Sequence, residues 1–197
     1  MPSTSTFRVP PAPIRGLYGR ALEWYARRTY GEVPDNAYVL WHNRKVLRAI
    51  FGFEQKVARL DALDPHLQTF AQMASAGVIG CSWCLDFGYF LAHREGLDER
   101  KVREVPRWRE SGVFTTLERD VMEYAEAMSA TPPTVTDEMV AGLRDRLGDP
   151  AVVELTALVA IENERSRFNS AMGLASQGYS EVCELPLAVP AVESSAS

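Results

Sequence analysis

Two cysteines three residues apart, Cys81 and Cys84, open a segment with helical spacing and could carry thiol redox chemistry. Thiols on the first turn of a helix face the same side, and the free backbone N–H groups and the helix dipole stabilise a thiolate there. Such a pair can alternate between a dithiol and a disulfide. Gly77 and Gly80, just upstream, would let the chain turn sharply into this helix. The residues therefore predict a redox-active pair at Cys81 and Cys84.

The same Cys-x-x-Cys spacing also occurs as half of a zinc site, which needs two more ligands. The sequence has no second Cys-x-x-Cys, and none of the other candidate ligands has the spacing of a zinc motif; these are His42, His66, His93 and Cys183. We therefore expect no metal and no cofactor. A further alternative, in which both thiols are buried structural residues without chemistry, stays open.

Two residues just after the cysteines bear on the surroundings of the sulfurs. On a helix Cys81, Cys84 and Gly88 share one face, because residues three and four apart are neighbours. The missing side chain at Gly88 either admits a neighbouring helix or leaves room for a substrate, and both alternatives stay open. Asp86 points away from Cys84, so it is better suited to bind another element than to act as a base for that thiol.

Composition limits the class of protein. The chain has 197 residues, 46% hydrophobic and 24% charged, which is typical of one ordinary globular domain. A net charge of -5 without a broad basic surface excludes nucleic acid as a partner. The N-terminus lacks an apolar signal core, and no apolar run reaches the roughly 20 residues of a membrane span. Three cysteines are too few for a disulfide-stabilised scaffold, and Cys183 has no partner if Cys81 pairs with Cys84. Both observations favour a cytoplasmic protein.

Nearly every segment has helical spacing, and none shows sustained apolar and polar alternation, so the predicted fold class is all-α. Capping signals such as Thr115 with Glu118 support this class. We expect about eight helices, near 15–30, 36–60, 65–78, 82–95, 98–104, 116–129, 137–147 and 150–176. They form one helical domain over residues 14–184, with flexible tails at 1–13 and 185–197.

Three stretches together resemble one known superfamily. They are Gly80-Cys81-Ser82-Trp83-Cys84, then Ala160-Ile161-Glu162-Asn163 with Arg167-Phe168-Asn169-Ser170-Ala171-Met172-Gly173, and Tyr38 through Phe51 with Trp41-His42-Asn43. In this combination, over residues 35 to 176, the chain resembles the carboxymuconolactone decarboxylase and alkylhydroperoxidase D-like (AhpD-like) superfamily. The resemblance implies a compact helical bundle that assembles as a homo-oligomer, whether a dimer, a trimer or a hexamer.

The resemblance also implies a chemistry. In peroxidase-like members a cysteine pair reduces hydroperoxides and is re-reduced by a partner thiol system. The expected partners are therefore a thiol reductant and a small-molecule substrate, either a hydroperoxide or a carboxylated or lactone compound. By motif position Cys84 would attack the peroxide and Cys81 would resolve it. The helix dipole alone favours Cys81 as the more acidic thiol, so which sulfur attacks stays open.

The chain departs from the peroxidase-like pattern at two positions. Those members carry a histidine four residues after the second cysteine and a glutamate about twelve before the first, where this chain has Gly88 and Thr69. Thiolate attack on an O–O bond needs a proton for the departing oxygen, so peroxidase activity should be weak unless other groups substitute. The candidate groups are Tyr38, His42 and Glu162.

Glu162 has a structural alternative. It lies on the apolar stripe of the last long helix with Arg165 three residues on, which favours a structural ion pair over a catalytic acid. The leading hypothesis is an enzyme, a thiol-disulfide oxidoreductase with weak alkylhydroperoxidase activity. The alternative is a non-redox decarboxylase, isomerase or cyclase with structural cysteines and an apolar pocket above Gly88. A third is a non-catalytic oligomeric binding protein.

Overall fold

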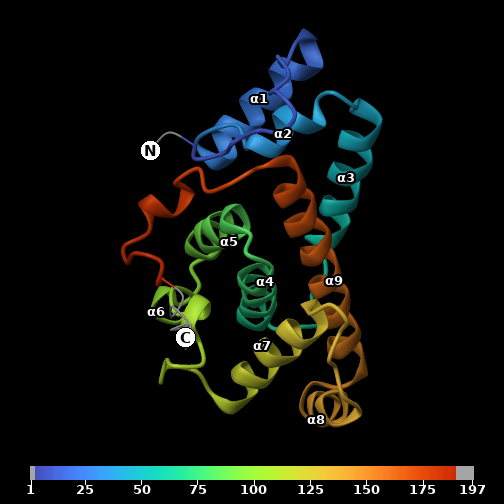
Figure 1. The fold of residues 1–197 in the computed structure, drawn as a ribbon, viewed down its shortest axis with the longest axis vertical. Helices are drawn as coiled ribbons and strands as arrows, with labels where there is room; N and C mark the ends of the chain where they lie inside the picture. The colour runs from blue at the N-terminus through green and yellow to red at the C-terminus, as the bar shows by residue number, and fades with distance from the viewer. Residues whose placement is uncertain (1–2, 190–197) are drawn as a thin grey trace, which may run out of the picture.

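A computed structural model describes residues 3–189, and in this part of the chain all regular elements are helical (Figure 1). The elements are α1 (Gly16–Tyr30), α2 (Asp35–Leu40), α3 (Arg44–Val57), α4 (Pro65–Ile79), α5 (Ser82–Arg94), α6 (Glu99–Val102), the 3-10 turn η1 (Val105–Arg107), α7 (Thr116–Ser129), α8 (Asp137–Leu147), α9 (Asp149–Met172) and the 3-10 turn η2 (Tyr179–Val182). The predicted all-α class is confirmed. Among the described residues, no helix has both the length and the apolar character needed to cross a bilayer.

The core is built around α4, which Figure 1 shows enclosed by α5, α7 and α9. Apolar residues occupy several faces of α4, and Phe70 and Met73 are almost completely buried. The small side chains of Ala71 and Ala74 allow neighbouring helices to approach closely. Because α5 and α9 both pack on α4, the helix with the cysteines is fixed relative to the long C-terminal helix.

The chain turns sharply between α4 and α5 at Gly80, as predicted, whereas Gly77 lies within α4. Gly80 ends α4 with a positive φ of 83°, a conformation that glycine adopts without strain. Cys81 then caps α5, because its sulfur accepts a hydrogen bond from the backbone N–H of Cys84 at 3.2 Å. Cys81 is therefore the N-cap of α5, and Cys84 lies in the first turn.

The predicted single helix over 36–60 is wrong, because the chain forms two helices there. Residues 41 to 43 separate α2 from α3. The side chain of Asn43 accepts hydrogen bonds from the backbone N–H groups of Lys45 and Val46, at 3.2 and 3.3 Å. An asparagine in this position starts a new helix, since it satisfies N–H groups that have no partner within the helix.

The last helix ends at Met172, four residues earlier than predicted, because Gly173 adopts a positive φ of 73°. A side chain at Gly173 would also meet the Thr6 carbonyl oxygen, which lies 3.1 Å from the position of a Cβ. The N-terminal segment runs past this helix end: the N–H groups of Thr6 and Arg8 bond the carbonyls of Gly173 and Met172. Composition predicted a flexible tail over residues 1–13; within its described part, Thr6 and Arg8 bond the end of α9, and the N–H of Ala12 bonds the Tyr38 carbonyl of α2.

At the other end of the chain, the N–H of Ala188 bonds the Arg103 carbonyl at 2.9 Å, and Ala188 is buried. The segment after η2 thus reaches back to α6. The remainder of the predicted tails, residues 1–2 and 190–197, lies outside the described part of the chain.

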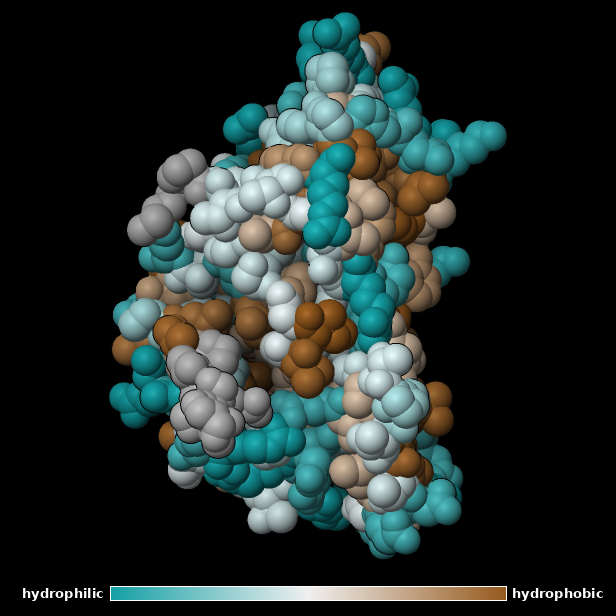
Figure 2. Space-filling view, viewed as in Figure 1, coloured by the Kyte–Doolittle hydropathy of each residue, from teal (hydrophilic) through white to brown (hydrophobic). Residues whose placement is uncertain are grey.

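An apolar surface extends over α1 and α3, at the upper right of Figure 2. Tyr25 of α1 and Phe51 of α3 contact each other edge to face, with ring centroids 6.4 Å apart. Both rings are more than one third exposed. The other exposed apolar side chains of these two helices are Leu17, Tyr18, Trp24, Val46 and Phe53. We call these seven residues the α1–α3 apolar surface.

Candidate redox site

The sulfur atoms of Cys81 and Cys84 lie at disulfide-bonding distance at the N-terminus of α5, with their Cα atoms 5.3 Å apart. That Cα separation is within the ordinary range for a disulfide. Both residues are buried: Cys81 is 3% exposed and Cys84 is 9% exposed. Both belong to an apolar cluster that includes Val39, Phe90 and Leu174.

Three polar side chains of α9 form a row that faces the cysteines. They are Glu162, Ser166 and Asn169, all buried. The Ser166 hydroxyl lies 3.3 Å from the Cys84 sulfur and 2.8 Å from Oε1 of Glu162. The Asn169 amide nitrogen lies 3.4 Å from the Cys84 sulfur and 3.9 Å from the Cys81 sulfur. A continuous chain of polar contacts therefore joins Glu162 to Cys84 through Ser166.

The environment of Glu162 favours its neutral form. Burial raises the pKa of Glu162 to about 7, although the nearby Arg165 guanidinium acts in the opposite direction. A carboxyl group with this pKa can both donate and accept a proton near neutral pH. Of the groups predicted to handle protons, Glu162 is the one that a hydrogen-bonded chain connects to a sulfur in the described residues.

The predicted ion pair between Glu162 and Arg165 is present, with Nη1 3.3 Å from Oε2. Arg165 is shared, however. Its guanidinium also binds both carboxylate oxygens of Glu54 on α3, at 2.8 and 2.5 Å, and the Gln72 side chain of α4 at 2.8 Å. Arg165 therefore connects three helices and holds one oxygen of Glu162, while the other oxygen faces Ser166.

No hydrogen bond of the described residues joins Tyr38 or His42 to either sulfur. The charges that act on the Tyr38 phenol are mainly those of Arg27 and Glu23 on α1, and burial raises its pKa. The His42 ring lies 2.8 Å from the carbonyl oxygen of Pro10, with Nε2 as the contact atom. These contacts place both residues with α1 and the N-terminal segment.

Asp86 binds another element, as its position on the helical wheel predicted. Its carboxylate accepts hydrogen bonds from the backbone N–H groups of Gln177, Gly178, Tyr179 and Ser180, at 2.8 to 3.1 Å. It also accepts one from the Ser180 hydroxyl at 2.7 Å. Asp86 therefore holds the turn at η2 against α5, and no contact of the described residues brings it to the sulfurs.

Gly88 faces α4 at close range. A Cβ added there would lie 3.3 Å from Cγ of Met73, which is itself buried. Helix packing therefore accounts for the glycine, and Met73 fills the space that a substrate would need.

One side of α5 carries an aromatic layer. Trp83 stacks on Phe87 with ring centroids 4.8 Å apart, and Tyr179 contacts both rings edge to face. The indole N–H of Trp83 donates to the Gln177 side chain at 2.9 Å. This layer fixes the orientation of α5 and so the position of the cysteine pair.

The third cysteine, Cys183, and the cavities among the described residues lie away from the Cys81–Cys84 pair. Burial raises the pKa of the Cys183 thiol to about 11, so without a bound cation it is not a thiolate at neutral pH. A cavity of about 470 Å³ lies beside α6 and η1, lined by Arg100, Arg103 and Arg107 among others. The guanidiniums of Arg103 and Arg107 already bind Glu104, and neither Cys81 nor Cys84 lines this cavity.

The candidate proton-handling groups predicted from the sequence include neither Ser166 nor Asn169. A signal for both is present in the chain. Glu162, Ser166 and Asn169 stand at positions i, i+4 and i+7 of α9, so they share one face. Because α9 is apolar around Leu155 and Leu158, three polar residues in one row of a buried helix indicate a partner across the interface.

An all-helical fold with a Cys-x-x-Cys pair at the start of one core helix defines an AhpD-like protein. The chain belongs to the carboxymuconolactone decarboxylase family, whose sequence profile matches residues 44–127. An uncharacterized protein of Escherichia coli K12, YnjA, is 34% identical over 184 residues, which cover 90% of this chain and 97% of YnjA. The resemblance seen in the sequence is confirmed.

Two solved structures share the fold. The debrominase Bmp8, in a cysteine-to-alanine variant bound to 2,3,4-tribromopyrrole, superposes with a TM-score of 0.78 at 19% identity. The match covers 90% of this chain and 96% of Bmp8. An uncharacterized peroxidase-related protein with an alkylhydroperoxidase AhpD core, from Ralstonia eutropha JMP134, has a TM-score of 0.74 at 15% identity. That match covers 89% of this chain and 97% of the other.

Proposed function

We propose that the protein is a thiol-disulfide oxidoreductase that reduces hydroperoxides through Cys84 and Cys81. The observation that carries this proposal is the contact chain from Glu162 through Ser166 to Cys84, in a cysteine pair already placed for a disulfide. These contacts supply a group for proton transfer to Cys84. Such a group is needed because this protein has Gly88 where peroxidase-like members carry a histidine. Family membership supports the same class of reaction.

In the first step the Cys84 thiol loses its proton to the Ser166 hydroxyl, which passes its own proton to Glu162. The Cys84 thiolate then attacks the outer oxygen of the hydroperoxide, ROOH. An S–O bond forms and the O–O bond breaks, so that the sulfur is oxidised by two electrons to a sulfenic acid. The departing RO⁻ recovers the proton from Glu162 through Ser166 and leaves as the alcohol.

In the second step the Cys81 thiol attacks the Cys84 sulfenic acid. The S–S bond forms, and water leaves with the proton of the Cys81 thiol. A dithiol reductant then returns both cysteines to thiols by exchange, and is itself oxidised to a disulfide. We place this reductant in the cytoplasm, where an unpaired thiol such as Cys183 remains reduced.

The geometry supports Cys84 as the attacking sulfur. It contacts two side-chain donors, Ser166 and Asn169, at 3.3 and 3.4 Å. Cys81 instead accepts the N–H of Cys84 as the helix cap. Donors at both sulfurs stabilise negative charge, but the proton relay reaches Cys84.

The α1–α3 apolar surface supports a homo-oligomer, which the family resemblance also implies. Exposed apolar patches of this kind are typical of protein contact sites. Aromatic residues are enriched in such interfaces, and this surface has five of them. A second copy of the chain is the occupant we propose.

The function is tested with Cys84→Ser and Cys81→Ser, assayed for reduction of an organic hydroperoxide with dithiothreitol as the reductant. We expect Cys84→Ser to lose turnover. Cys81→Ser, reduced and then freed of dithiothreitol, should consume one equivalent of peroxide and leave a sulfenic acid on Cys84, which dimedone traps and mass spectrometry detects. Cys183→Ser is the matched control and should keep activity. Full activity on a carboxylated or lactone substrate in both serine variants would instead support the non-redox alternative.

A further inference from the structure

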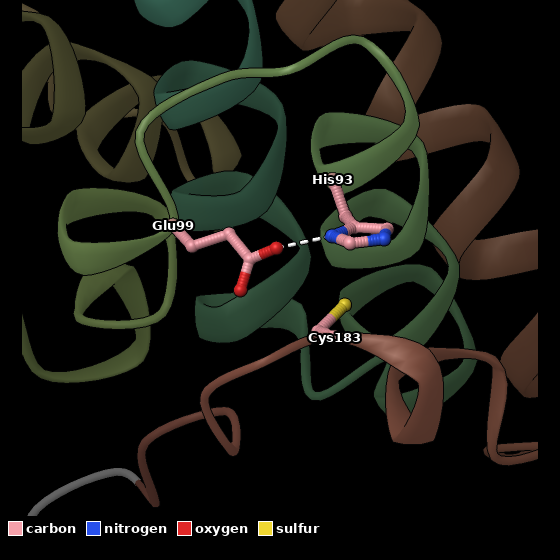
Figure 3. Close-up of side chains that lie close together, drawn as sticks. All are labelled: His93, Glu99 and Cys183. Carbon is pink, nitrogen blue, oxygen red and sulfur yellow. Dashed lines mark hydrogen bonds and ion pairs between the residues drawn. The ribbon is translucent and has the colours of Figure 1, made fainter.

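Three side chains with metal-binding atoms meet at the far end of α5 from the cysteine pair. His93 comes from the last turn of α5, Glu99 from the first residue of α6, and Cys183 from the end of η2 (Figure 3). One nitrogen, one oxygen and one sulfur of this set all lie within 4.8 Å of one another. Nδ1 of His93 is in contact with Oε1 of Glu99.

The donors of this cluster suit one class of metal. Imidazole nitrogen, thiolate sulfur and carboxylate oxygen are the three ligand types of zinc, at about 2.0 to 2.3 Å from the ion. A tetrahedral ion with such bonds places its ligand atoms about 3.3 to 3.8 Å apart. The two ligand atoms of the trio that lie farthest apart would therefore have to approach each other by at most about 1 to 1.5 Å. Rotation of the His93 ring, which is 32% exposed, would exchange its bond to Glu99 for one to the ion.

The surroundings hold the carboxylate of Glu99 in a fixed orientation. Its other oxygen, Oε2, accepts the backbone N–H groups of Glu184 and Leu185, at 3.0 and 3.4 Å, and the Tyr89 hydroxyl at 3.4 Å. Oε1 of Glu99 therefore points toward His93 and Cys183. Outer-shell hydrogen bonds of this kind orient metal ligands and raise their affinity for the ion.

We propose that His93, Glu99 and Cys183 bind one zinc ion, with a water molecule as fourth ligand. The partial exposure of His93 gives the ion a path from solvent and leaves the fourth position open. Zinc bound here would hold the segment after η2 to the start of α6, since Cys183 belongs to that segment and Glu99 to the helix. The site is separate from the cysteine pair and does not depend on the proposed redox function.

Isothermal titration with Zn²⁺ tests the site in the full-length protein with the Cys81–Cys84 disulfide closed. Cys183 is then the sole thiol of the chain. We expect one equivalent of Zn²⁺ to bind, and Co²⁺ in its place to give a thiolate-to-cobalt charge-transfer band. Cys183→Ser and His93→Gln should each weaken binding by at least about tenfold, since loss of an outer-shell partner alone weakens it about 10- to 100-fold.

His42→Gln is the matched control, because His42 is exposed and binds the Pro10 carbonyl away from the cluster. It should bind Zn²⁺ as the wild type does. The proposal is overturned if the wild type binds no Zn²⁺ at millimolar concentration or if Co²⁺ gives no thiolate band. It is equally overturned if Cys183→Ser retains full affinity. The Co²⁺ spectrum of the wild type decides the question even if a variant fails to fold.

Discussion

The hydroxyl of Ser166 lies between the Cys84 sulfur, 3.3 Å away, and the Glu162 carboxyl oxygen, 2.8 Å away. A hydroxyl has one proton to donate and can accept others, so Ser166 donates to one of these groups while accepting from the other. Reversing both hydrogen bonds moves one proton between Glu162 and Cys84. The pair of contacts is therefore the geometry that the proposed proton relay requires.

Ser166→Ala should lower hydroperoxide turnover by about 100-fold, within the roughly 10²- to 10⁴-fold range of general acid-base catalysis. The variant keeps both cysteines and Glu162 but breaks the path between them. Steady-state rates are measured at a temperature where circular dichroism shows the variant folded. Ser170→Ala, on the exposed face of the same helix, is the matched control. A rate within about twofold of the wild type in Ser166→Ala would rule out the relay.

Glu162 should make the stability of the protein depend on pH. Its pKa is raised by burial from 4.5 to about 7, so the folded state binds this proton more tightly than the unfolded state does. The stabilisation is complete below pH 4.5 and is lost as pH rises through 7. At about 1.4 kcal/mol per pKa unit, the loss is on the order of 3 kcal/mol, read from urea unfolding at several pH values.

Glu162→Gln isolates this contribution, because glutamine resembles the protonated acid and does not titrate. The wild type minus variant difference in the free energy of unfolding should fall with rising pH over that window. Glu123→Gln, at an exposed position of α7, is the control and should retain the wild-type pH dependence over the same window. A difference that is flat, or that rises with pH, would contradict the raised pKa of Glu162.

Helix boundaries with local signals could be predicted from the sequence. The helices at 116–129 and 137–147 have the predicted bounds, because Thr115 and Thr136 cap them with their own side chains. The break before α3 was missed, since Asn43 stands within a continuous helical pattern and its capping role depends on the backbone conformation it adopts. Such a cap is hard to distinguish from an asparagine inside a helix.

The candidate site was predictable in part for a similar reason. Cys81 and Cys84 are neighbours in sequence, so their pairing at a helix start follows from local spacing. The contact of Ser166 with Cys84 joins residues 82 positions apart and depends on how α9 crosses α5. Likewise, only the packing of α4 on α5 shows that Met73 faces Gly88.

Gly88→His should not restore a peroxidase-like proton relay. A Cβ at this position already lies 3.3 Å from Met73 Cγ, so an imidazole would overpack the interface between α4 and α5. We expect a loss of about 1 to 3 kcal/mol in the free energy of unfolding and no gain in turnover. Gly77→Ala is the control, because a Cβ there meets nothing within 4 Å. A Gly88→His variant as stable as the wild type and more active would show that the space is open.

Asp86→Asn should destabilise the turn at η2. The Asp86 carboxylate accepts four backbone N–H groups and the Ser180 hydroxyl, whereas an asparagine side chain offers one oxygen and directs N–H donors at the remaining N–H groups. Hydrogen bonds to a charged group contribute about 1.5 to 3 kcal/mol each, so losing two or more should lower the free energy of unfolding by at least about 3 kcal/mol.

Amide hydrogen exchange locates this effect, since the N–H groups of residues 177–180 should exchange faster in Asp86→Asn while those of α4 change least. Asp64→Asn is the matched control: Asp64 caps α4, and asparagine caps a helix as well as aspartate does. That variant should therefore be nearly as stable as the wild type. Wild-type protection of residues 177–180 in Asp86→Asn would mean that the turn is held by Trp83 and Tyr179 packing instead, and that the carboxylate serves some other role on α5.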